Sequence, residues 1–264
     1  MKKFSKNLKK LSFSFLILFF FSQNSFAASS RNMTIFAESN MVLALTKIAR
    51  LYSQKSNVVV SVNFAPASEL INNIDSGEPS DVFISAHPGW IETLRRKGLV
   101  DVYNIGYIAG DNLALVTSKS NPDLPSELID KKVDLAKALE ILDKNKSTLI
   151  LDSSDSSSGK FSNDFVKAHS LSNLKIFKKL TEDKTQILNM LRSNKEEYAL
   201  LLTSQVEGRK DLKILAVKDD EYVFYQALAI AGDNMEIARE FLKFLKSPAA
   251  QLILEENGFV INWK

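Results

Sequence analysis

The pattern of apolar and polar positions is clearest near the start of the chain. Residues 33–37 are mostly apolar and predict a short strand, which a polar turn, Glu38-Ser39-Asn40, follows. Beyond the turn, residues 42–51 carry apolar side chains at nearly helical intervals, which predicts an amphipathic helix. We expect Ser39 or Asn40 to cap this helix, because both side chains accept hydrogen bonds from the free N–H groups of a first turn.

The same order of strand, turn and helix then occurs twice more. Residues 57–64 are β-branched and apolar, and helical spacing follows at residues 70–74. Residues 81–86 read as a buried strand, and residues 88–97 as a helix that begins with proline, which a first helical position tolerates. Three successive strand–helix units imply a parallel sheet covered by helices.

A second series of elements follows, and the chain then returns. We predict strands at residues 113–117, 146–151, 174–178, 198–203 and 222–231, and helices at residues 133–142, 160–168, 184–191, 235–245 and 249–254. The expected fold is α/β with two lobes, each a mostly parallel sheet flanked by helices, joined by two hinge strands. We assign residues 28–112 and 221–264 to the first lobe and residues 113–220 to the second. Ligands of open α/β sheets bind at the strand ends, so the cleft between the lobes is the expected site.

The first 27 residues have the features of a secretory signal peptide. Five lysines and no acid precede an 11-residue run of Leu, Ile, Phe and Ser, and small residues precede a cut after Ala27. The run is shorter than the roughly 20 residues that span a membrane. We therefore expect cleavage after Ala27 and export to the periplasm; an uncleaved membrane anchor is the alternative.

Removal of this segment changes the charge balance. Without its five lysines the chain has 237 residues, with 29 basic against 31 acidic side chains and a formal net charge of −2. Nucleic-acid binding depends on a basic surface, so we expect no nucleic-acid partner. The sequence contains no cysteine, which excludes disulfides, thiolate metal ligands and a lipid-modified cysteine.

Hydroxyl groups occupy several of the predicted turns between strands and helices. They belong to Ser39, Ser68, Ser156–Ser158 and Thr203-Ser204. Hydroxyls and backbone N–H groups are neutral donors, and helix N-termini favour anions, so such turns from two lobes would encircle a tetrahedral oxyanion. The alternative is that the turns only cap helices and that the serine-rich stretch 152–158 is a flexible surface loop.

Catalytic motifs are missing from the sequence. It has no Gly-x-Ser-x-Gly motif, no glycine-rich phosphate loop and no dinucleotide fingerprint. His87 and His169 fall in different predicted lobes, without the clustered acids of a metal site. We predict no enzyme activity, no cofactor and no directly bound metal. A secreted hydrolase using a serine of 156–158 and an anion-regulated interaction protein are the alternatives from other classes.

Several segments resemble the periplasmic molybdate-binding proteins of ABC transporters, which are type II solute-binding proteins. They are residues 34–39 (TIFAES), 64–70 (FAPASEL), 76–86 (SGEPSDVFISA) and 241–258. The resemblance covers nearly the whole mature chain and is close in the first lobe and loose in the second. It implies a monomeric receptor that captures molybdate or tungstate by hinge closure and delivers it to an inner-membrane permease. Sulfate, phosphate or a small organic anion are the alternative ligands.

The resemblance also implies ligand contacts in the first lobe. The family's first serine ligand falls on Asn40 in an ungapped count, and Ser39 is the nearest hydroxyl, so we retain both as candidates. Ala67 stands where the family usually has a second serine; its N–H remains a possible donor, and Ser68 is adjacent. The loss of a bond to a charged group costs about 1.5–3 kcal/mol.

Three further contacts are implied in the second lobe. Ser158 and Lys184 match positions that contribute backbone N–H groups, and Thr203 stands where many members have a tyrosine hydroxyl. The side chain of Lys184 adds a cation that either turns toward the anion or points to solvent. Because Asn40, Ala67 and Thr203 differ from the residues that the family usually has, the sequence leaves the identity of the preferred anion open.

Overall fold

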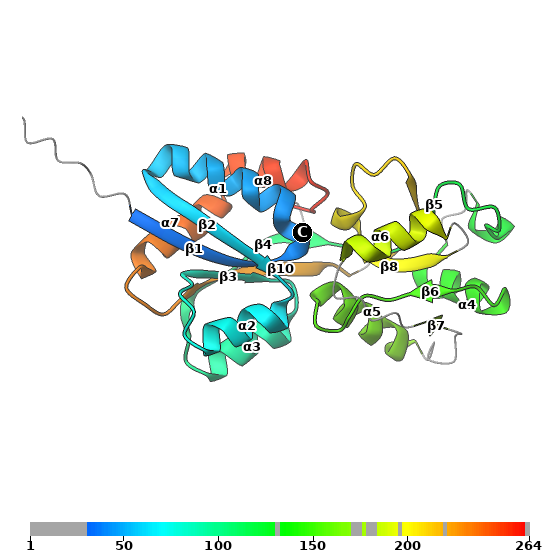
Figure 1. Cartoon of the computed structure of the whole chain (residues 1–264), viewed down its shortest axis with the longest axis horizontal. Coiled ribbons are helices and arrows are strands. Elements are labelled where there is room, and N and C mark those ends of the chain that lie inside the picture. Colours follow the sequence, from blue (N-terminus) through cyan, green and yellow to red (C-terminus); the bar gives the residue numbers. More distant parts are fainter. Residues whose placement is uncertain are drawn as a thin grey trace, which may run out of the picture.

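The computed structural model describes residues 31–129, 133–169, 176–177, 184–194, 197–218 and 221–261. The predicted signal peptide and its cleavage site lie outside these residues. Two sheets lie beside each other as separate lobes, each with helices on its faces (Figure 1). The two-lobed α/β fold predicted from the sequence is confirmed. Within the described ranges, none of the helices combines the length and apolar character needed to cross a membrane.

The first sheet is mixed. Its strands, in spatial order, are β2 (Val58–Ala65), β1 (Arg31–Glu38), β3 (Val82–Ser85), β10 (Val223–Ile230) and β4 (Val100–Asp111). β1 runs parallel to β2 and β3, as the strand–helix repeat predicts. β10 runs antiparallel to β3 and β4, because it brings the chain back from the other lobe.

Helices cover both faces of this sheet. They are α1 (Val42–Ser56), α2 (Ala67–Asp75), α3 (Pro88–Arg96), α7 (Met235–Leu245) and α8 (Pro248–Glu255). Met33 and Ile35 of β1 belong to the apolar cluster that includes α1, whereas Phe36 belongs to the cluster that includes α2 and α3. Because both faces are covered, β1 has to be apolar at successive positions rather than at alternate ones.

The second sheet repeats this mixture of directions. Its strands, in spatial order, are β7 (Ile176–Phe177), β6 (Leu149–Ile150), β8 (Tyr198–Leu202), β5 (Leu113–Ser118) and β9 (Leu212–Val217). Its helices are α4 (Leu135–Lys144), α5 (Ser157–Ala168) and α6 (Lys184–Ser193). The short 3-10 helices η1 (Ser39–Met41), η2 (Ser126–Leu128) and η4 (Thr203–Gln205) complete the described elements.

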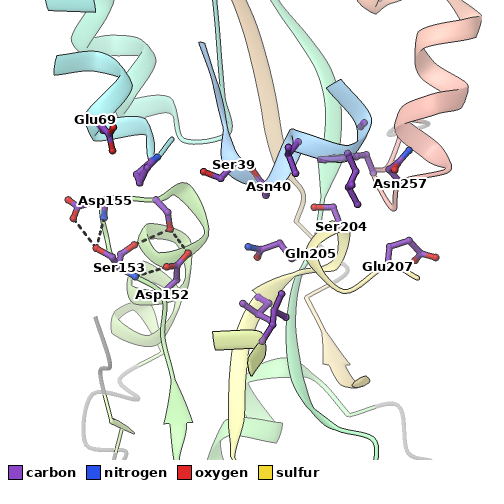
Figure 2. Close-up of a pocket in the computed structure, with 18 of the residues that line it drawn as sticks. Ser39, Asn40, Glu69, Asp152, Ser153, Asp155, Ser204, Gln205, Glu207 and Asn257 are labelled. Carbon is purple, nitrogen blue, oxygen red and sulfur yellow. Dashed lines mark hydrogen bonds between the residues drawn. The ribbon is translucent and has the colours of Figure 1, made fainter. Parts of the chain in front are cut away.

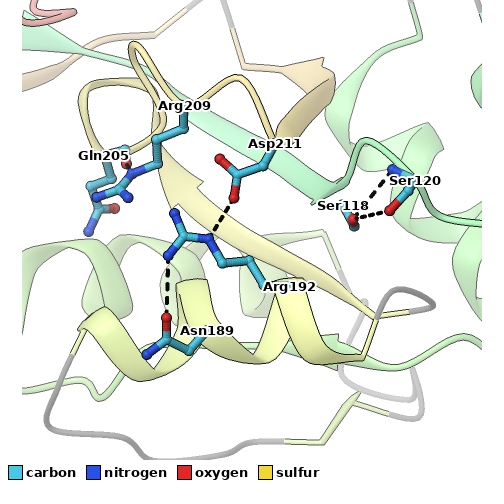
Figure 3. A network of polar contacts seen from close by, with 7 residues as sticks. All are labelled: Ser118, Ser120, Asn189, Arg192, Gln205, Arg209 and Asp211. Atoms are coloured by element: carbon cyan, nitrogen blue, oxygen red, sulfur yellow. Dashed lines mark hydrogen bonds and ion pairs between the residues drawn. The ribbon is translucent and has the colours of Figure 1, made fainter.

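An ion pair attaches α6 to the start of β9. Nε of Arg192 lies 2.5 Å from Oδ2 of Asp211, and Nη1 of Arg192 donates to Asn189 at 3.3 Å (Figure 3). The hydrogen bond from Arg192 holds the pKa of the Asp211 carboxyl below its usual value. Both side chains are partly exposed, so the pair adds little stability and serves mainly to fix the end of the helix.

Asp111 and Asn112 form one of the connections between the lobes. β4 ends at Asp111 in the first sheet, and β5 begins at Leu113 in the second. A second connection leads from β9 back to β10, where the N–H of Lys218 donates to the carbonyl of Leu113 at 2.8 Å. Lys218 therefore lies beside Leu113, at the point where the first connection enters the second sheet.

Candidate functional site

A cleft of about 1300 Å³ lies between the two lobes. The first lobe contributes Ser39 and Asn40, which follow β1, and Ser68, which follows β2. The second lobe contributes Ser153, before α5, and Ser204, after β8 (Figure 2). The cleft thus lies at the carboxyl ends of β1, β2 and β8, where open α/β sheets bind ligands.

The turn after β1 does not cap α1 in the predicted way. Ser39–Met41 form the 3-10 helix η1, and Met41, which makes no side-chain capping bond, precedes α1. The predicted cap by Ser39 or Asn40 is wrong, because the extra 3-10 turn moves both residues away from the free N–H groups of α1. Nδ2 of Asn40 instead donates to the hydroxyl of Tyr225, and Ser39 lines the cleft.

The two candidates at the start of α2, Ala67 and Ser68, differ in whether their side chains reach the cleft. Ala67 is the first residue of α2, and its side chain is buried in the cluster with Phe36 and Leu70. Ser68 lines the cleft, and its N–H donates to the carbonyl of Asp155 across the lobes at 3.4 Å. Ser68 is therefore the hydroxyl that this turn presents to the cleft, and Ala67 can contribute only its backbone.

The serine-rich stretch before α5 is folded inward. Oγ of Ser156 caps α5 by accepting from the N–H of Gly159 at 3.0 Å, and it donates to Oδ2 of Asp152 at 2.6 Å. Ser157 and Ser158 belong to the first turn of α5 and are buried. The alternative of a flexible surface loop is therefore wrong: α5 begins three residues earlier than predicted.

Gly159 lies where the chain approaches itself most closely. A Cβ at this position would lie 2.0 Å from the carbonyl oxygen of Ser153. Real Cβ atoms do not come this close to backbone, so the first turn of α5 can pack against the loop before it only because residue 159 has no side chain.

Ser158 and Thr203 have polar partners inside the second lobe and the hinge. Oγ of Ser158 donates to Oε1 of Gln205 at 3.0 Å. Oγ1 of Thr203 donates to Oδ1 of Asp111 at 2.7 Å, and the N–H of Ser204 donates to the same oxygen at 3.2 Å. Neither Ser158 nor Thr203 is among the residues that line the cleft, whereas Ser204 and Gln205 are.

Asp111 and Tyr225 form a buried polar pair behind the cleft. Burial raises the pKa of the Asp111 carboxyl to about 6, although hydrogen bonds from Ser204, Thr203 and Asn112 oppose the rise. Burial also raises the pKa of the Tyr225 phenol well above its usual value, and the nearby carboxylate of Asp111 adds to the effect. Tyr225 is thus a neutral hydroxyl at physiological pH.

Lys184 is the first residue of α6. Its side chain lies outside the described residues. The two orientations predicted from the sequence, toward the anion and toward solvent, therefore both stay predictions. Its backbone lies at the N-terminus of a helix, where N–H groups are free to bind an acceptor.

Glu38 is the site residue that the sequence analysis missed. It is the last residue of β1 and only 1% exposed. Its Oε1 atom accepts from Oγ of Ser85 at 2.5 Å, from the N–H of Ala86 at 3.0 Å and from Oγ of Ser157 at 2.5 Å. Glu38 is the first residue of the polar turn 38–40, and nothing in its local sequence distinguishes a buried acid from an exposed one.

The described lining of the cleft is rich in carboxylates. Its charged side chains are those of Arg209 and of the acids Glu69, Asp152, Asp155, Glu207 and Glu256. Such a lining gives an approaching anion no long-range attraction. An anion bound here has to be held by short-range neutral donors, namely hydroxyls and N–H groups.

The two histidines are not placed for nucleophilic catalysis. Nδ1 of His87 accepts from the N–H of Gly89 at 3.0 Å, and its Nε2 lies 3.7 Å from Oδ2 of Asp164. Nδ1 of His169 lies 3.0 Å from the carbonyl oxygen of Phe165. Ser158 donates to Gln205 rather than to either ring. Across the described ranges no group of acids and histidines could hold a metal ion either.

Comparisons with known proteins agree with this geometry. A family model described as bacterial extracellular solute-binding protein matches residues 33–260. Molybdate-binding protein ModA of Haemophilus influenzae is 28% identical over 248 residues, which cover 89% of this chain and 92% of the relative.

Two solved structures share the fold. A periplasmic molybdate-binding protein of Azotobacter vinelandii matches with a TM-score of 0.69 and 16% identity, over 88% of this chain and 100% of its own. A tungstate ABC transporter protein of Geobacter sulfurreducens matches with a TM-score of 0.69 and 16% identity, over 85% of this chain and 98% of its own. At these identities the structures support the two-lobed fold alone.

Proposed function

We propose, since this chain belongs to the family of bacterial extracellular solute-binding proteins, that it captures a small oxyanion in the cleft between its lobes and delivers it to a membrane transporter. The family is one of solute-binding proteins, not of enzymes. Molybdate and tungstate are the first candidates, because they appear in the names of the relatives from Haemophilus, Azotobacter and Geobacter. Sulfate, phosphate and small organic anions are the alternatives.

One observation carries the proposal. A single carboxylate oxygen of Glu38 is held by two hydroxyls and one N–H group, which come from both lobes. This supports an anion site built from neutral donors, because the end of β3 and the first turn of α5 already stabilise an anionic oxygen, with no cation at bonding distance among the described residues. Hydrogen bonds to charged groups are about twice as strong as neutral ones, so a few such donors suffice.

The proposed contacts follow the positions of the candidates. We propose that Ser39, Asn40 and Ser68 contact the anion directly, because they line the cleft. Ala67, Ser158 and Lys184 are proposed to contribute backbone N–H groups, since each lies in the first turn of a helix. Thr203 is proposed to act through the turn that its bond to Asp111 fixes.

The remaining assignments are also proposals. The lobe boundaries at residues 112/113 and 220/221 are supported by the strands, since each described strand of the second sheet lies within residues 113–220 and each of the first lies outside. We propose a periplasmic monomer, released by cleavage after Ala27, that docks on an ABC permease and binds no nucleic acid. The relatives' names support the periplasm and the transporter.

Isothermal titration calorimetry tests the proposed function. The protein without residues 1–27 is titrated with molybdate, tungstate, sulfate and phosphate in turn. We expect one site per chain, with molybdate and tungstate binding more tightly than sulfate. Binding of sulfate or phosphate alone would reassign the anion, and the absence of heat with all four would reject an inorganic oxyanion as the ligand.

A further inference from the structure

Glu38 places a negative charge where an oxyanion site needs positive potential. It ends the strand β1, which lies between β2 and β3, and the next residue in the chain, Ser39, lines the cleft. The side chain is almost fully buried, and among the described residues it forms no ion pair. A buried carboxylate without a cation is costly, so its hydrogen-bond donors have to stabilise it.

The donors around Glu38 are those expected around one oxygen of a bound oxyanion. Ser85 and Ala86 lie at the end of β3 in the first lobe, and Ser157 is the first residue of α5 in the second. All three donate to the same oxygen, Oε1, while Oε2 is buried without a partner. One anionic oxygen shared by two lobes is the contact through which a ligand would close this fold.

The contact also joins the lobes. The distance from Oε1 of Glu38 to Oγ of Ser157 is 2.5 Å. It is shorter than the backbone bond from Ser68 to Asp155, at 3.4 Å, and than the approach of His87 to Asp164, at 3.7 Å, which also run between the lobes. Glu38 therefore provides an anionic oxygen that accepts hydrogen bonds from both lobes, as a bound oxyanion would.

We propose that Glu38 is an internal stand-in for the oxyanion and thereby determines the affinity of the cleft. Its carboxylate holds Ser85, Ala86 and Ser157 behind the lining of the cleft, so an oxyanion bound at the neighbouring Ser39 has either to displace it from these donors or to bind beside its charge. Two anionic oxygens cannot share one set of donors without strong repulsion, so Glu38 weakens binding of doubly charged anions. The proposal rests on the proposed function, because it names the residue that tunes the same site.

Calorimetry with molybdate on the full exported chain tests the proposal, using wild type, Glu38→Ala and Glu38→Gln. Both variants should bind molybdate roughly tenfold more tightly or better, because the competing charge is gone. Glutamine keeps the length of the side chain and an acceptor oxygen, so it tests the charge even if alanine disturbs folding. Thermal denaturation of each variant checks that the fold is intact.

Glu69→Ala is the matched control. Glu69 lines the cleft, but no described donor forms a hydrogen bond with its carboxylate, so its removal should tighten binding by only about threefold or less. Equal increases in molybdate affinity in the Glu69 and Glu38 variants would overturn the proposal. The loss of one negative charge near the cleft would then explain both increases. Unchanged or weaker binding in the folded Glu38 variants would overturn it too.

The outcomes also separate this inference from the proposed function. If wild type binds molybdate and the Glu38 variants bind no better, the inference fails and the oxyanion function stands. If only the Glu38 variants bind, the stand-in is supported and the natural chain is not a molybdate receptor. If neither wild type nor variants bind any of the four anions, both the inference and the function fail.

Discussion

Replacing Ser39 and Ser68 together by alanine weakens molybdate binding by roughly two to four orders of magnitude. Both residues line the cleft, one after β1 and the other after β2. A lost hydrogen bond to a charged group costs about 1.5–3 kcal/mol. Two such losses amount to about 3–6 kcal/mol, and each 1.4 kcal/mol is a tenfold change in affinity. Calorimetry of the double variant measures the effect.

A matched double variant controls for the loss of two hydroxyls. Ser76 and Ser126 are exposed and lie outside the cleft, so Ser76→Ala with Ser126→Ala should bind molybdate as wild type does. If the cleft variant keeps full affinity while its thermal denaturation matches wild type, the turns after β1 and β2 do not contact the anion. The ligand residues would then have to be sought at α5 and α6.

Asp111 makes the protein lose stability as the pH rises from about 4 to about 6. Burial raises the pKa of its carboxyl from 3.8 to about 6, so in this interval the folded protein binds a proton that the unfolded chain has released. Stability is therefore fully present below the unfolded pKa and falls by about 1.4 kcal/mol per pH unit up to the folded pKa, about 3 kcal/mol in all.

Asp111→Asn should remove this slope. Asparagine keeps the acceptor oxygen for Thr203 and Ser204 but does not ionise, so the variant is expected to be at least as stable as wild type at pH 7. Urea denaturation of both proteins at several pH values gives the free energies of unfolding. Asp143→Asn, which changes an exposed carboxyl on α4, is the control and should keep the wild-type slope. If the free energy of unfolding decreased equally with pH in wild type and in Asp111→Asn, the prediction would be contradicted.

Local periodicity accounts for most of what the sequence predicts of the fold. α7 covers residues 235–245 as predicted, because its apolar side chains recur at helical spacing and have a sheet to cover. β9 was missed although five of residues 212–217 are apolar, and it is recognised as a strand by its antiparallel pairing with β5. Such a strand depends on a distant neighbour, which local periodicity does not reveal.

The site could be predicted only in part, for the same reason. Chain order places Ser39 and Ser68 on turns after parallel strands, and both line the cleft. The role of Glu38 depends on Ser85 and Ser157, which are 47 and 119 residues away in the sequence. In its local sequence Glu38 is one polar residue of a turn, and its burial becomes visible only when the two lobes are placed together.

Anomalous diffraction from crystals grown with tungstate locates the bound anion, because tungsten marks its position. We expect one tungsten peak per chain in the cleft, with Ser39 and Ser68 within hydrogen-bond distance of the tungstate oxygens. A peak outside the cleft, or none at saturating tungstate, would contradict the assignment of this cleft as an oxyanion site.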